Sequence, residues 1–211
     1  SSSANFTSRF AARAARCRRT PKAMRSGAKF KFVLKAWPGV FVLAVALAFL
    51  TGLVGGFFGF DLQQQVSLDV VLHARGWNLA FLVMQVVLLA PILEELLFRG
   101  ALCKLPVKGL GLLTKGPNRG VWIVAAVLSS VLFSFTHYAL NFSTNPHGQL
   151  VYLGLKSLDN AFLALFFFGL AQCWIYRRTG SLWCAMLNHA LFNLTNLVLL
   201  FVSDYFGFSL P

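Results

Sequence analysis

The stretch that decides the fold runs from Asn78 to Gly100 and reads NLAFLVMQVVLLA followed by PILEELLFRG. The apolar run continues to Cys103, so it exceeds the roughly 20 residues of helix that cross the hydrocarbon core of a bilayer. Glu94, Glu95 and Arg99 nevertheless lie within it. Ionisable side chains are costly in hydrocarbon, and those that occur usually face the bundle interior and have a partner. The stretch therefore predicts a transmembrane helix whose charged side chains face other helices.

The composition of the whole chain agrees with this prediction. Hydrophobic residues make up 57% of the 211 residues and charged residues 12%, whereas about a quarter of an ordinary soluble domain is charged. Apolar runs long enough to span a membrane are Trp37 to Phe60, Asn78 to Cys103, Val121 to Leu140, Leu158 to Tyr176 and Leu182 to Val202. We expect an all-α integral membrane protein, a bundle of about five transmembrane helices, with residues 37–211 as its membrane domain.

Residues 1–36 have a different composition. Ten of the nineteen Lys and Arg residues precede Trp37, and this basic, Ser-, Ala- and Arg-rich leader contains no acidic residue. Organelle transit peptides have this composition, and so do polybasic segments that lie on anionic lipid as an interfacial helix. The inner membrane or thylakoid of a plastid or mitochondrion and a bacterial cytoplasmic membrane are equally compatible with it. Nucleic acid is not an expected partner, because no folded module with aromatic and basic residues accompanies the charge.

The basic residues outside the leader predict how the spans are oriented. Short loops on the cytoplasmic or equivalent side of a membrane are enriched in Lys and Arg. With five spans, the leader, the loop from Lys104 to Arg119 and the turn at Arg177 and Arg178 all fall on the same side.

The two adjacent glutamates are predicted to have different surroundings. Glu95 and Arg99 are four residues apart and can pair along one face of a helix. Glu94 points about 100° away from Glu95 around the helix axis. One glutamate can therefore be neutralised by the arginine while the other faces a cavity.

Polar residues recur in two further spans, at a spacing that repeats. The three motifs are Glu94-Glu95-x-x-x-Arg99, Phe133-x-x-x-His137 and His189-x-x-x-Asn193. Residues four apart share a helix face, so polar groups from three helices can converge. In this order, each on a hydrophobic helix, the motifs resemble those of the CPBP family, which comprises CAAX prenyl proteases and bacteriocin-processing or Abi-type intramembrane proteases. The resemblance covers about Leu79 to Leu200.

The resemblance implies an intramembrane endopeptidase and assigns its catalytic residues. Glu94 is implied as the general base, and His137 helps to hold and activate the water. His189 and Asn193 are implied as donors to the carbonyl oxygen that becomes negative, and Glu95 belongs to the same catalytic set. Such a site supplies what peptide hydrolysis requires, a base beside a water and donors at the oxyanion.

Two further residues are expected to support this site, and a metal is the alternative to a metal-free mechanism. Arg99 and Phe133 are interpreted as structural supports, Arg99 as the partner of Glu95 or of a helix end. Zinc is the alternative to a metal-free site, and its ligands would be His137, His189 and Glu94. The ligand set is poor for zinc, because the chain has no His-Glu-x-x-His pair and Asn is a weak ligand. We therefore expect no cofactor.

A second hypothesis belongs to a different class of protein. Single histidines in membrane helices also serve as packed core residues or as axial ligands of haem or chlorophyll. The chain can then be a non-catalytic accessory or assembly subunit of a larger membrane complex, organellar and pigment- or haem-containing, that retains the protease fold. As an enzyme, it is expected to take a peptide or protein substrate that enters from the lipid bilayer.

Overall fold

The computed structural model describes residues 24–57, 71–72, 74–113, 119–139, 142–144, 150–152 and 161–207. The interfacial helix predicted in the leader lies outside these residues. The elements are α2 (Ser26–Phe57), α4 (Gly76–Met84), η1 (Gln85–Leu89), α5 (Ala90–Glu95), η2 (Leu96–Lys104), α6 (Leu105–Leu113), α7 (Arg119–Ala139), β1 (Phe142–Thr144), β2 (Leu150–Tyr152), α8 (Ala161–Thr179) and α9 (Leu182–Phe206). Here η1 and η2 are π-helical.

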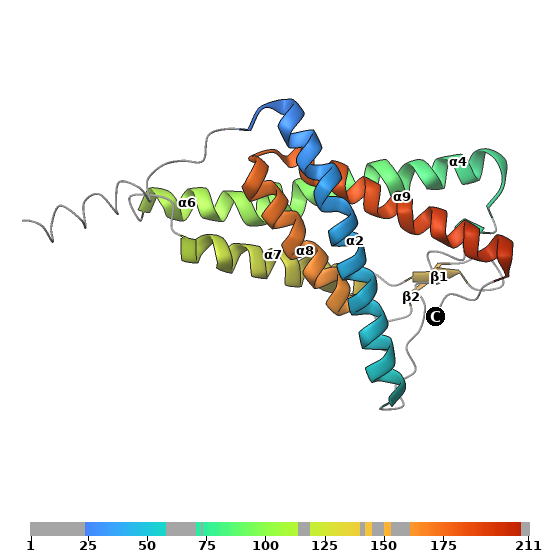
Figure 1. Ribbon diagram of the computed structural model, residues 1–211. Helices are drawn as coiled ribbons and strands as arrows, with labels where there is room; N and C mark the ends of the chain where they lie inside the picture. The colour runs from blue at the N-terminus through green and yellow to red at the C-terminus, as the bar shows by residue number, and fades with distance from the viewer. Residues whose placement is uncertain are drawn as a thin grey trace, which may run out of the picture.

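The segments from α4 to α6 form one helix that runs across the molecule (Figure 1). Helix α7 packs along η2 and α6, and α9 packs along η1 and α5. Helices α2 and α8 contact each other, and α8 also contacts α7, α9 and η2. The long helix is therefore covered by a different partner on each of its halves, with the charged motif where the halves meet.

Four helical stretches are long and apolar enough to cross a membrane. They are Ser26–Gly55, Gly76–Gly109, Arg119–His137 and Leu182–Phe206. The fourth predicted span, Leu158 to Tyr176, corresponds to α8, which has 19 residues, carries Arg177 and Arg178 in its last turn, and buries the polar Gln172. The predicted all-α membrane bundle is confirmed, and α8 is a helix of this bundle that is not among the four most apolar ones. A short antiparallel pair, β1 with β2, joins α7 to α8.

The first helix starts earlier than predicted. It begins at Ser26 and not at Trp37, and so contains Lys29, Lys31 and Lys35. The prediction assigned these lysines to the leader. A lysine can lay its methylene chain along an apolar helix and keep its ammonium group in water, so basic residues do not end a helix near the membrane surface.

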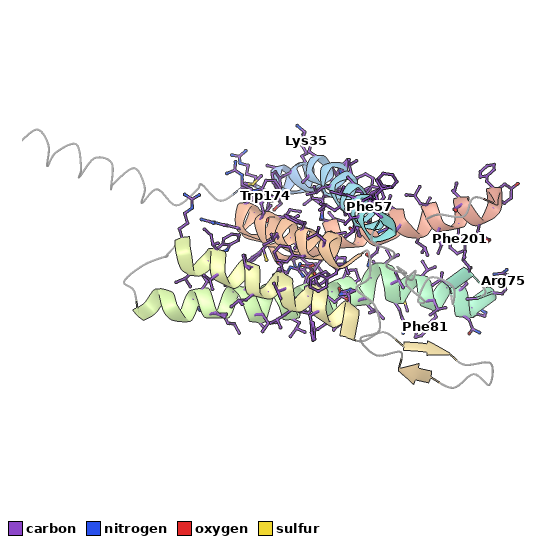
Figure 2. All side chains as sticks on the ribbon, turned by 90° about the horizontal axis from the view of Figure 1, so that it is seen from below. Lys35, Phe57, Arg75, Phe81, Trp174 and Phe201 are labelled. Carbon is purple, nitrogen blue, oxygen red and sulfur yellow. The ribbon has the colours of Figure 1, made fainter. Side chains whose placement is uncertain are left out.

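The outer surface of the bundle suits a membrane. Large apolar side chains are exposed on every long helix, among them Phe57, Phe81 and Trp174. Figure 2 shows Arg75 and Phe81 toward one end of the bundle and Lys35 and Trp174 away from that end. Contiguous exposed apolar surface of this extent marks contact with lipid or with other proteins.

Aromatic rings fill the centre of the bundle. The Phe133 ring of α7 is fully buried and lies 5.2 Å from the Phe98 ring of η2 and 6.0 Å from the Phe168 ring of α8, measured between centroids. Helices α7 and α8 approach closely beside these rings, because a Cβ on Gly169 would lie 3.0 Å from the Cβ of Ser130. Glycine at position 169 therefore permits the close packing of α7 and α8.

Candidate active site

Glu95 and Arg99 form a buried ion pair within the long helix. Arg99 Nη1 lies 3.2 Å from Glu95 Oε1, and both side chains are fully buried. Arg99 Nη2 donates to the carbonyl oxygen of Gly169 at 3.1 Å, and its guanidinium carbon lies 4.6 Å from the centre of the Phe133 ring. A buried ion pair is tolerated when further hydrogen bonds and ring contacts compensate for lost hydration. The predicted pairing is confirmed, and it leaves Glu94 without the arginine.

His189 lies between the two glutamates. Its Nδ1 is 2.9 Å from Glu95 Oε1 and its Nε2 is 3.6 Å from Glu94 Oε2. An ionised carboxylate only accepts hydrogen bonds, so Nδ1 donates to Glu95. The ring is buried, with its centroid 4.9 Å from that of Phe168 and 5.9 Å from that of Phe133. Aromatic packing and the Glu95 contact together orient Nε2 toward Glu94.

His137 reaches the same glutamate from α7. Its Nε2 lies 3.8 Å from Glu94 Oε2, while its Nδ1 is 2.9 Å from the carbonyl oxygen of Phe133. Because a carbonyl oxygen cannot donate, Nδ1 carries the hydrogen, and in the neutral ring Nε2 keeps a free lone pair. The expected spacing of Phe133 and His137 thus fixes the ring through the Phe133 backbone as well as its side chain.

Glu94 is the more accessible of the two glutamates. The side chains of Glu94 and His137 are 25% and 29% exposed, whereas Glu95 is fully buried. Glu94 Oε2 itself is buried and has no hydrogen-bond partner among the described residues. This oxygen faces two imidazole nitrogens at 3.6 and 3.8 Å, beyond hydrogen-bond length, so neither histidine engages it.

Asn193 makes its contact elsewhere on the long helix. Its Nδ2 donates to the carbonyl oxygen of Val86, in η1, at 2.8 Å. The structure therefore brings Glu94, Glu95, His137 and His189 together. Asn193 also links α9 to the long helix, one turn from His189 along α9.

A metal was the alternative for this site. In the described ranges, no group of three or more His, Cys, Asp or Glu side chains is spaced to hold a metal ion. Glu94, His137 and His189, the ligands named for zinc, lie within these ranges and do not form such a group.

Three contacts of the site involve residues that were not predicted. They are the carbonyl oxygens of Gly169 and Val86, which accept from Arg99 and Asn193, and the Ser129 hydroxyl, which donates to the Phe98 carbonyl at 2.7 Å. Only the proline at position 91 signals any of them, because a proline inside a helical run removes a backbone donor.

The comparisons with known proteins agree with this site. Residues 76–195 match a family described as Rce1-like, "Type II CAAX prenyl endopeptidase Rce1-like". The match spans more than half of the chain and contains all the residues of the candidate site. No curated protein matches the chain, and no solved structure matches it.

Proposed function

The chain belongs to the Rce1-like family of type II CAAX prenyl endopeptidases, and from this premise we propose that it hydrolyses a peptide bond within the membrane by means of water activated by Glu94 and His137. The observation that carries the proposal is the position of Glu94. Its carboxylate faces the Nε2 atoms of both histidines, while the neighbouring Glu95 is neutralised by Arg99.

In the proposed reaction Glu94 is the base. It accepts a proton from the water as the water oxygen bonds to the scissile carbonyl carbon. The Nδ1 hydrogen of His137 is held by the Phe133 carbonyl oxygen, so its Nε2 is the nitrogen that contacts and orients the water. The proton then passes from Glu94 to the amide nitrogen as the carbon–nitrogen bond breaks, which regenerates the carboxylate.

The negative oxygen formed at the carbonyl carbon needs donors. His189 can donate from Nε2 when protonated, since its Nδ1 is engaged by Glu95. Asn193 has two amide hydrogens, one of which is engaged by Val86, so one remains to donate. The substrate is a peptide or protein segment that reaches the site from the bilayer.

The test is cleavage by the purified full chain in lipid nanodiscs. A prenylated carboxyl-terminal CAAX peptide, the same peptide without the lipid, and a hydrophobic transmembrane peptide are the three substrates, with products identified by mass spectrometry. Glu94→Gln should abolish cleavage of whichever peptide the parent cuts, since it keeps the size of the side chain and removes the base. The matched control is Asp204→Asn, the same change at an exposed acid near the end of α9. Equal rates for Glu94→Gln and the parent would refute the proposed base.

A further inference from the structure

The long helix passes through a proline without ending. Pro91 lies three residues before Glu94, at the start of α5, and its side chain is buried. Proline has no backbone N–H, and inside a helix it leaves an earlier carbonyl oxygen without its usual donor. In a membrane such a carbonyl must be satisfied from within the protein.

The helical register before Pro91 identifies this carbonyl. Segment η1 is π-helical, and the Ala90 N–H that follows it donates to the carbonyl oxygen of Gln85, five residues earlier. The next bond in the same register would run from residue 91 to the carbonyl oxygen of Val86. Pro91 cannot donate it.

The missing donor is supplied from another helix. Asn193 Nδ2, on α9, donates to the Val86 carbonyl oxygen at 2.8 Å. Neighbouring side chains are known to satisfy backbone groups that a proline frees in transmembrane helices. A hydrogen bond between α9 and the long helix therefore takes the place of a backbone hydrogen bond within the long helix.

We propose that Asn193, besides the donor role proposed above, has a positioning role: one of its amide hydrogens substitutes for the N–H that Pro91 lacks and so fixes η1 and α5 against α9. The bond lies one turn from His189 on α9 and about two turns before Glu94 on the long helix. It holds in register the two helices whose side chains meet at 2.9 Å between His189 and Glu95 and at 3.6 Å between His189 and Glu94. Its effect on catalysis rests on the proposed function, whereas its effect on the helix does not.

The test is a double-mutant cycle with Asn193→Ala, Pro91→Ala and both changes, in the full chain in nanodiscs. The readouts are the thermal unfolding midpoint, amide hydrogen exchange of residues 85–95, and kcat and KM on any cleaved peptide. Asn193→Ala should lower the midpoint and speed exchange in this segment by on the order of tenfold, the effect of one lost buried hydrogen bond. It should lower kcat with little change in KM.

Pro91→Ala is the decisive background, because alanine restores an N–H at position 91. There Asn193→Ala should change exchange much less than it does with proline present, and the kcat loss that remains there measures its proposed donation to the oxyanion. Asn193→Leu, which nearly keeps the volume of the side chain and cannot donate, is the second variant. It should speed exchange in residues 85–95 of the parent, and this readout does not require Pro91→Ala to fold.

Two outcomes overturn the inference. One is a loss of kcat on Asn193→Ala that is equally large in both backgrounds with unchanged exchange, which would assign Asn193 to the substrate alone. The other is an exchange rate in residues 85–95 that neither Asn193 variant alters. If the parent cleaves no peptide, the proposed function fails, while the exchange and unfolding arms still decide the role of Asn193.

Discussion

His189 donates from Nδ1 to Glu95 Oε1 over 2.9 Å, and this contact joins α9 to the long helix at a point where both side chains are almost completely buried. Glu95 in turn is paired with Arg99. The Glu95 carboxylate thus orients the His189 ring, whereas the Glu94 carboxylate beside it remains available to accept a proton. These roles can be separated by mutation.

Arg99→Ala should lower the free energy of unfolding by about 3–5 kcal/mol, because it leaves the Glu95 carboxylate buried without its partner. Denaturant unfolding in detergent micelles measures this. Arg178→Ala, at the exposed end of α8, is the matched control and should unfold like the parent. Replacing both partners, Glu95→Leu with Arg99→Met, should be less destabilising than Arg99→Ala alone. A single variant as stable as the control would mean that the ion pair does not hold the helix.

Gly169→Ala should destabilise the protein by about 1–3 kcal/mol, the usual range for overpacking a core. The new Cβ would lie 3.0 Å from the Cβ and 3.1 Å from the Cα of Ser130, so α7 and α8 must separate and the Arg99 bond to the Gly169 carbonyl lengthens. Gly39→Ala is the control with the opposite sign. Nothing lies within 4 Å of its Cβ, and an alanine in a helix is favoured over glycine by up to about 1 kcal/mol. Unfolding curves that shift in the same direction for both variants would contradict this account.

His137→Ala and His189→Ala should differ in stability although both reduce cleavage. His137 is 29% exposed, and its loss should reduce kcat by about 10²- to 10⁴-fold while unfolding changes by about 1 kcal/mol or less. His189 is buried against Glu95, and its loss should also cost about 1.5–3 kcal/mol of stability, the value of a hydrogen bond to a charged group. Paired kinetic and unfolding measurements compare the two. Equal stability losses would show that burial does not distinguish these histidines.

Strong chelation should leave cleavage unchanged, because the proposed base and donors act without a metal. A zinc site would respond differently. Its metal would polarise the carbonyl and activate the water, so chelation would stop turnover and added zinc would restore it. The measurement is activity after dialysis against a chelator, together with the zinc content of active protein. Stoichiometric zinc whose removal abolishes activity would overturn the metal-free mechanism and leave the peptidase proposal intact.

The meeting of Glu94, His137 and His189 could be predicted from the sequence. Each lies in an apolar run long enough to be a membrane helix, and buried ionisable groups in such helices are driven toward one another by the cost of facing lipid. The spacing of Glu95 and Arg99 similarly predicts a contact within one helix, which requires no knowledge of the packing.

Other contacts could not be predicted, because they depend on how the helices pack. The sequence contains Pro91, but whether Val86 or Val87 loses its donor depends on the π-helical register of η1. That register appears only in the structure, where the Ala90 N–H donates to the Gln85 carbonyl oxygen. The choice of Gly169 as the acceptor for Arg99 depends likewise on the approach of α8 to α7. The start of α2 at Ser26 was missed for a different reason, since charge alone does not mark a helix end.

The pairing of Glu95 with Arg99 inside one helix also bears on how the protein is made. Helical turns form in well under a microsecond, so this pair can close as soon as residues 95 to 99 become helical, before α8 and α9 have been synthesised. The segment then enters the bilayer with its arginine already neutralised, and the Gly169 carbonyl and His189 are added when the later helices arrive. The segment that is inserted into the membrane then carries one carboxylate without an arginine partner, Glu94. The same carboxylate is the proposed base.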